Sequence, residues 1–291
     1  MLDDVVIMIK VIDKVSNLKQ YFPLNSFSMV EWKKYICDLV DSEDNIFIKD
    51  MNETINTGKY SFENDFFPVL NNALSKENEI NDWAKTFQEL TLDLDDKLCN
   101  DFGKSVDATI VLYLGLCNGA GWAISLNNNQ YILLGVEKIL ELGWTSKDYL
   151  MGLIYHELGH IYQNQYGILT KDFNNNYDRF LWQLFTEGIA MYFEQVLCND
   201  INFYNRSKEW LQWCDNHLNE IKKDFWEDLA VINPTNQSYF GDWVRYKGHS
   251  DVGYYLGAKF IHYIMKDNEF DDVLSWNIEE VKKAYQEFLK N

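Results

Sequence analysis

Two histidines and a glutamate in the segment YHELGH (155–160) have the types and the spacing that bind a catalytic metal ion. His156 and His160 are four positions apart, and Glu157 directly follows the first histidine. On an α-helix, residues i and i+4 project from the same face about one turn apart, so both imidazoles can aim at one point. We therefore predict that His156 and His160 bind a zinc ion, Zn2+. Glu157 is then the general base, which takes a proton from the water that attacks a carbonyl group.

A catalytic zinc ion needs a third protein ligand and keeps one position open for water. Glu187, in the segment TEGIAMYFE (186–194), is the best candidate, because it lies on the next expected helix, which can return antiparallel to the first. Alone, Glu187 would be an ordinary exposed glutamate, but its apolar flanks would bury its charge, which then needs a metal ion or a partner. Gly188 and Ala190 are small enough for close packing against the first helix, and Glu194 is the reserve ligand.

A third segment, RYKGHSDVGYYLGAKFIHYI (245–264), supplies hydrogen-bond donors for a transition state. Tyr254, Tyr255 and His249 are candidates for stabilising a developing oxyanion, although each of them alone could have a structural role. Two glycines four positions apart in this segment let a helix approach another backbone closely. The two histidines that remain are expected to be packing or surface residues: His217 and His262.

The motif has the signals of a helix around it. Thr145 and Asp148 have the spacing of a capping box, and an apolar pattern follows over residues 149–165. Tyr166 and Gly167 then provide the stop. After a short loop, the pattern of residues 177–197 predicts a second long helix, which carries Glu187.

Strands are expected only upstream of the motif. The segment DATIVLYLGL (107–116) is β-branched and apolar, which is typical of a buried strand. Residues 121–139 indicate two strands around the turn NNN. The first hundred residues favour helices, with residues 28–40, which Ser28 can cap, and residues 78–98 as the clearest.

These patterns predict an α+β fold that is mostly helical, with a small antiparallel or mixed sheet beside the HExxH helix. We expect residues 1–105 to form a helical N-terminal region. Residues 106–291 would form the catalytic domain, with its strands at about 107–139 and helices after them.

Composition narrows the class of protein. The chain has 291 residues, 47% of them hydrophobic and 24% charged, as in an ordinary soluble globular protein. Its net charge of −19 argues against nucleic acid or an anionic membrane as partner. No apolar run reaches the roughly 18 residues of a membrane span, and the acidic start of the chain, MLDDVVIMIKVIDKV, is no secretory signal. Five cysteines without a CxxC motif suggest reduced, mostly buried thiols. We expect a cytoplasmic protein, with export by another route left open.

The segments HELGH (156–160), EGIAMY (187–192) and GYYLG (253–257), with the strand pair before them, resemble the gluzincin group of zinc metallopeptidases. They are similar to the thermolysin-like and aminopeptidase-like enzymes, and most of all to bacterial families of predicted zinc-dependent proteases. The resemblance covers roughly residues 106–265. It implies a zincin-like catalytic domain that binds a peptide or protein substrate along an edge strand, in some part of residues 119–136.

By the same resemblance, zinc would be bound by His156, His160 and Glu187, with Glu157 as general base. Tyr254 or Tyr255 would then stabilise the oxyanion.

The chain departs from the family pattern in two places. His160 and Glu187 are separated by 26 residues, more than in the best-known members, so either the loop is longer or another residue such as Glu194 is the ligand. Met191 stands where the family often has an aspartate that orients a histidine ligand. Another carboxylate or carbonyl must then orient the histidine.

The leading hypothesis is a zinc metallopeptidase. One alternative is a zinc hydrolase that acts on a non-peptide amide or ester in the same site. Another is a non-enzymatic binding protein that retains the fold and the metal ion. The intact Glu157 counts against the binding protein, because metal binding alone does not require a general base. The sequence does not indicate an oligomeric state.

Overall fold

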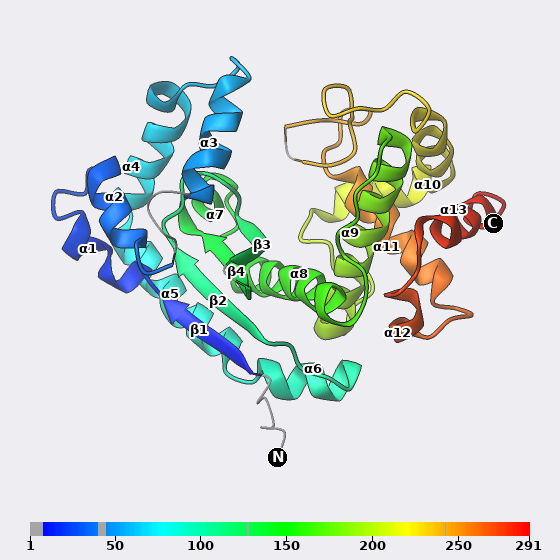
Figure 1. The fold of residues 1–291 in the computed structure, drawn as a ribbon, viewed down its shortest axis with the longest axis horizontal. Coiled ribbons are helices and arrows are strands. Elements are labelled where there is room, and N and C mark those ends of the chain that lie inside the picture. The colour runs from blue at the N-terminus through cyan, green and yellow to red at the C-terminus, as the bar shows by residue number, and fades with distance from the viewer. Residues whose placement is uncertain (1–7, 40–44, 127, 242) are drawn as a thin grey trace. The chain divides into compact units, whose positions relative to one another are not determined.

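The computed structural model describes residues 8–39, 45–126, 128–241 and 243–291 (Figure 1). The chain divides into two compact units, Met1–Ile154 and Tyr155–Asn291. The boundary between them falls inside helix α8 (Lys147–Tyr166). The N-terminal segment that was weighed as a secretory signal lies partly outside the described residues, since it includes residues 1–7.

A four-stranded mixed sheet belongs to the first unit, with the strand order β1-β2-β4-β3 (Figure 1). β1 pairs with β2, and β2 with β4, in parallel, whereas β3 is antiparallel to β4. The prediction of an α+β chain that is mostly helical, with a small mixed sheet, is therefore confirmed. The bounds of the strands are β1 (Ile9–Asp13), β2 (Ala108–Tyr113), β3 (Gly121–Leu126) and β4 (Asn129–Gly135).

The predicted hairpin is present as β3 and β4. Its turn includes Asn128, which has a φ of 63°, and asparagine tolerates this left-handed conformation better than most residues do. Asn127, which precedes it in the sequence, lies outside the described residues. Along the paired strands, Ala123 is opposite Ile132 and Trp122 is opposite Leu133.

The strand β1 lies in the region that was expected to be helical. It pairs with β2 from Ile9 opposite Ala108 to Asp13 opposite Leu112, so the sheet draws its first strand from the N-terminal region. The expected division between residues 105 and 106 consequently falls within the first unit. The pattern of β1 is uninformative, because it is a five-residue edge strand in which only Ile9 is buried.

Helices of the first unit surround this sheet. Their bounds are α1 (Leu18–Tyr21), α2 (Met29–Ile36), α3 (Ile46–Asn56), α4 (Phe67–Ser75), α5 (Glu77–Thr91), α6 (Leu94–Phe102) and α7 (Val136–Glu141). The predicted cap of α2 is confirmed, since the hydroxyl of Ser28 accepts a hydrogen bond from the backbone N–H of Glu31. α2 is fixed to the end of β2 by two bonds to Leu114. The indole N–H of Trp32 donates to the carbonyl of Leu114 at 2.9 Å, and the backbone N–H of Leu114 donates to the hydroxyl of Tyr35 at 3.0 Å.

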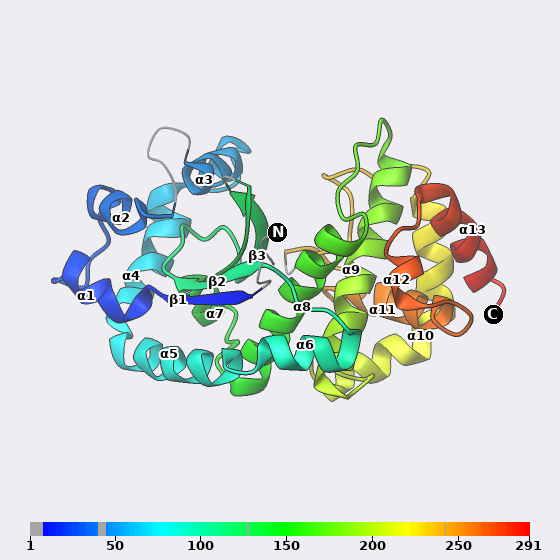
Figure 2. The ribbon, with the colours of Figure 1, turned by 60° about the horizontal axis from the view of Figure 1, so that its bottom comes forward.

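The second unit is helical. Besides the C-terminal part of α8, it contains α9 (Asn176–Cys198), α10 (Lys208–Asp228), α11 (Val252–Ile264), α12 (Phe270–Val273) and α13 (Ile278–Phe288). α9 and α11 lie side by side in both ribbon views (Figures 1 and 2). Their closest approach is at Gly188 and Gly257, because a β-carbon on Gly188 would lie 2.5 Å from the carbonyl oxygen of Gly257.

The structure bears on two expectations from composition, namely the absence of a membrane span and the burial of the cysteines. No described helix combines the length and the apolar character needed to cross a membrane. The expectation of mostly buried thiols is wrong for Cys37 and Cys99, which are exposed, whereas Cys214 is buried. Cys37 is the C-cap of the short helix α2, and Cys99 lies in the short helix α6. Each of these helices buries only one face.

Candidate metal centre

Helix α8 carries the two histidines and spans Lys147–Tyr166, as the pattern predicted. The residue that caps it differs from the prediction, because the hydroxyl of Ser146, not of Thr145, accepts a hydrogen bond from the N–H of Tyr149 at 3.3 Å. Directly after the helix, Gly167 allows the carbonyl of Leu274 to approach closely, since a β-carbon at this position would lie 2.2 Å from that oxygen.

The crossing of α8 and α9 brings the ligand candidates together. A β-carbon on Gly159 would lie 2.8 Å from the Cα of Ala190, so the two backbones touch at these residues. Gly159 lies between the two histidines, and Ala190 is three residues after Glu187 and four before Glu194. Both carboxylates therefore share the face of α9 that meets α8. The packing predicted for Ala190 is present, whereas Gly188 packs against α11 instead.

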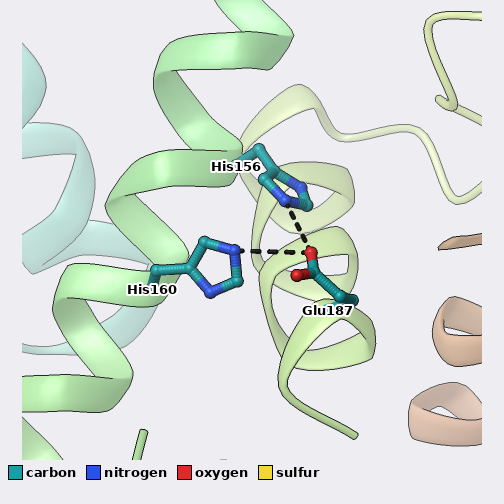
Figure 3. Close-up of side chains that lie close together, drawn as sticks. All are labelled: His156, His160 and Glu187. Atoms are coloured by element: carbon teal, nitrogen blue, oxygen red, sulfur yellow. Dashed lines mark hydrogen bonds and ion pairs between the residues drawn. The ribbon is translucent and has the colours of Figure 1, made fainter. Parts of the chain in front are cut away.

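Figure 3 shows both imidazoles and the Glu187 carboxylate pointing toward one another. One oxygen of Glu187, Oε2, lies 3.2 Å from Nε2 of His156 and 3.4 Å from Nε2 of His160. The ligand atoms of the three residues all lie within 4.8 Å of one another. Between 13 and 17% of each of these side chains is exposed, so the cluster is mostly buried and still reachable from solvent.

The three residues fit a zinc ion in number, type and spacing. Two histidines and one glutamate form a donor set of catalytic zinc sites, in which three protein ligands leave a position for water or substrate. Ligand atoms held tetrahedrally at about 2.0–2.2 Å from zinc are about 3.3–3.6 Å apart. The separations of 3.2 and 3.4 Å between Glu187 and the two histidines agree with that spacing.

Glu194 approaches the other nitrogen of His156. Its Oε2 lies 3.4 Å from Nδ1 of His156, and only 4% of its side chain is exposed. Histidine ligands commonly donate their second N–H to a carboxylate, which fixes the ring and its tautomer. Glu194, the reserve ligand, thus has the position of the orienting carboxylate that Met191 cannot supply. Nδ1 of His160 has no hydrogen-bond partner in the described part of the chain, so among these residues only His156 has a carboxylate at its second ring nitrogen.

The two carboxylates stabilise positive charge on His156. Burial alone would lower the pKa of His156, but the hydrogen bonds and charges of Glu187 and Glu194 outweigh it and raise the pKa to about 10. Burial would raise the pKa of Glu187, yet His160 and His156 reverse this and hold the pKa well below its usual range. The pKa of Glu194 is raised, mainly by burial.

Tyr254 is the oxyanion candidate that the structure brings to the cluster. It lies on the first turn of α11, and its ring centroid is 5.8 Å from that of His156. Its hydroxyl donates to no group among the described residues. Burial raises the pKa of Tyr254, and the charges of Glu187 and Glu157 raise it further, so the buried Glu157 carboxylate lies in the same region.

The other two oxyanion candidates interact elsewhere, and their predicted role is not supported. The hydroxyl of Tyr255 donates to Asp215 at 2.7 Å, because successive residues of a helix point about 100° apart and only one of the two tyrosines can face His156. His249 precedes α11 and stacks on Trp213 with ring centroids 3.8 Å apart.

The two remaining histidines lie outside the cluster, as expected. His217 stacks on the ring of Trp213, and its Nδ1 lies 2.7 Å from the carbonyl of the same residue. His262 contacts Gln195 through its Nε2, at 2.7 Å from Oε1.

The sequence contained a signal that Glu194 lies near the cluster, and it led to the prediction of Glu194 as a reserve ligand. Glu187 and Glu194 are seven residues apart, and this spacing places both on one face of a helix, two turns apart. The spacing alone could not show which carboxylate reaches Nε2 and which reaches Nδ1.

Comparisons with protein-family models, with curated proteins and with solved structures found no match for this chain. The assignment of the site therefore depends on its motif and its geometry.

Proposed function

We propose that this chain is a zinc-dependent peptidase of the gluzincin type. The convergence of His156, His160 and Glu187 beside Glu157 carries the proposal. This set combines three metal ligands with a carboxylate that is not needed for binding the metal, which is the composition of a hydrolytic site and not of a structural one.

His156, His160 and Glu187 would hold the zinc ion, and Glu194 would keep the ring of His156 in the orientation that binding requires. When bound, zinc polarises a carbonyl oxygen and lowers the pKa of a water molecule to about 7.

Two further residues would act on the substrate. The Glu157 carboxylate accepts a proton from the water that attacks the carbonyl carbon, and then delivers this proton to the leaving amine. The Tyr254 hydroxyl donates a hydrogen bond to the carbonyl oxygen as negative charge develops on it. No hydrogen bond of this hydroxyl is recorded among the described residues, so donation to a substrate would break none between them.

The proposal is tested by metal analysis and peptide turnover of four proteins: the wild type, Glu157→Gln, His160→Gln and His262→Gln. The His262 variant is the matched control, since this histidine lies in the same unit and contacts Gln195 instead of the cluster. We expect about one zinc ion per chain in all of them except His160→Gln. Glu157→Gln should keep its zinc and lose activity by a factor of about 10²–10⁴.

A wild type that binds no zinc would contradict the metal site. A zinc-loaded wild type that cleaves a broad peptide library no faster than Glu157→Gln would contradict peptidase activity. The same proteins should also be assayed with simple esters and amides. Turnover of these and not of peptides would favour a hydrolase of small non-peptide substrates.

A further inference from the structure

The residues just before α11 are held by an unusual set of contacts. Asp251 caps α11 with a φ of 61°, in the left-handed region, and its side chain makes no capping hydrogen bond. A helix cap normally has an extended backbone, and residues other than glycine adopt positive φ uncommonly, although aspartate and asparagine do so more often than the rest. The carboxylate of Asp251 is buried and pairs with the guanidinium of Arg206 instead.

Two more contacts hold the same short stretch. The indole of Trp210 donates to the carbonyl of Ser250 at 3.0 Å, and the ring of His249 stacks on Trp213. Trp210 and Trp213 belong to α10, and Arg206 lies two residues before that helix. Each of the residues 249–251 thus contacts either α10 or the segment just before it.

These contacts fix the direction of Tyr254. The N–H of Tyr254 donates to the carbonyl of Asp251 at 3.2 Å, so the position of Asp251 sets that of the first helical turn. On its other side, the ring of Tyr254 packs edge-on against Phe240 at 5.8 Å. Arg206 is also near enough to lower the pKa of Tyr254, against the larger effect of burial, which raises it.

We propose that Arg206 and Asp251 are positioning residues, which hold the first turn of α11 so that the Tyr254 hydroxyl meets the developing oxyanion of the substrate. This inference rests on the proposed peptidase function. The left-handed backbone at Asp251 and its ion pair with Arg206 would then fix where α11 begins, and with it the direction of Tyr254.

The alternative is that the ion pair only attaches α11 to its neighbour, and the chain offers a matched control for that role. Asp215 of α10 accepts from the Tyr255 hydroxyl at 2.7 Å and pairs with Lys259 at 3.1 Å. It therefore attaches the same helix through the adjacent tyrosine, which does not face His156. A purely attaching role predicts similar effects of Asp215→Asn and Asp251→Asn.

The kinetic test compares Asp251→Asn, Tyr254→Phe, the double variant and Asp215→Asn, all loaded with zinc. Asparagine tolerates positive φ, so Asp251→Asn removes the charge without forbidding the backbone conformation. We expect Tyr254→Phe to lower kcat about 100-fold, and Asp251→Asn to lower it about tenfold with KM unchanged. The double variant should be no slower than Tyr254→Phe, and Asp215→Asn should stay within about twofold of wild type.

A second measurement does not depend on activity. 3-Fluorotyrosine placed at residue 254 reports the surroundings of its ring by fluorine NMR, with and without zinc. Asp251→Asn should shift or broaden this resonance, whereas Asp215→Asn should leave it unchanged.

The inference is overturned if Asp251→Asn slows the Tyr254→Phe protein by the same factor as wild type, or if the fluorine resonance does not respond to it. A zinc-loaded wild type without peptidase activity overturns the proposed function instead, and the fluorine spectra then decide the placement of Tyr254 by themselves.

Discussion

The contact between Gly159 and Ala190 gives the sharpest prediction, because it sets the distance between the helices that carry the proposed zinc ligands. In Gly159→Ala, the new β-carbon would lie 2.8 Å from the Cα of Ala190 and 3.1 Å from the Cβ of Phe193. Carbon atoms pack at about 3.5–4.0 Å, so α8 and α9 must separate by roughly 0.7 Å. The Ala190 contact is with the backbone, and no side-chain rotation relieves it.

That separation exceeds what a zinc site tolerates. Ligand distances must stay within about 0.2 Å of their ideal values, and Glu187 is on one helix whereas both histidines are on the other. Rotation of the Glu187 side chain recovers part of the gap. We therefore expect zinc affinity to fall about 10–100-fold, which corresponds to roughly 1.4–2.8 kcal/mol. The free energy of unfolding without metal should change less, because overpacking costs about 1–3 kcal/mol and alanine returns about 1 kcal/mol of helix propensity.

The assay is a zinc competition titration against a chromophoric chelator, together with urea unfolding of the metal-free protein. Gly257→Ala is the control, since its β-carbon would lie 2.8 Å from the carbonyl oxygen of Leu184 and would push α11, which carries no ligand, away from α9. It should destabilise the protein and leave zinc affinity near that of wild type. Equal zinc affinity in Gly159→Ala and wild type, or an equal loss in both variants, would refute the reasoning.

Three other perturbations test separate parts of the structure. Glu194→Gln should weaken zinc binding about tenfold in the same titration, because the carboxylate that orients His156 becomes neutral; an unchanged affinity would contradict its role. Burial raises the pKa of Glu137 from 4.5 to about 7, so this residue contributes stability that is present below pH 4.5 and is lost as the pH rises through 7. Urea unfolding at pH 5.5 and 8 should therefore show a gain at the lower pH, from this residue at most about 2 kcal/mol, that is smaller in Glu137→Gln. Lys222 is buried and donates to the carbonyl of Phe288 near the end of α13, at 3.2 Å. Lys222→Met should lower the free energy of unfolding by about 1–2 kcal/mol, and an unchanged unfolding midpoint would show that this bond contributes nothing.

Local signals in the sequence predicted the long helices α8 and α9 and the approach of His156, His160 and Glu187 to one another. The spacing of His156 and His160 is converted into geometry by the α-helix itself, and small residues beside Glu187 indicated a close helix crossing. The adjacent pair Thr145 and Ser146 shows the limit of such signals, since either hydroxyl could cap the helix and only its actual start decides.

Features that depend on packing could not be predicted in the same way. Which of Tyr254 and Tyr255 faces His156 depends on the rotation of α11 about its axis. This rotation is constrained by the crossing with α9 at Gly188 and Gly257 and by the contacts that hold the residues before the helix. The short edge strand β1 has no apolar alternation, so it is recognisable only from its pairing with β2.

The position of the boundary between the units limits how the protein can be dissected. A fragment that begins at Tyr155 would discard the first two turns of α8, and with them the cap provided by Ser146. His156 would then occupy a fraying helix end with unsatisfied backbone N–H groups, instead of the middle of a 20-residue helix. The imidazole would lose its fixed direction although every residue of the proposed metal site remained in the fragment. Truncated versions intended to carry the metal site alone must therefore start before residue 146.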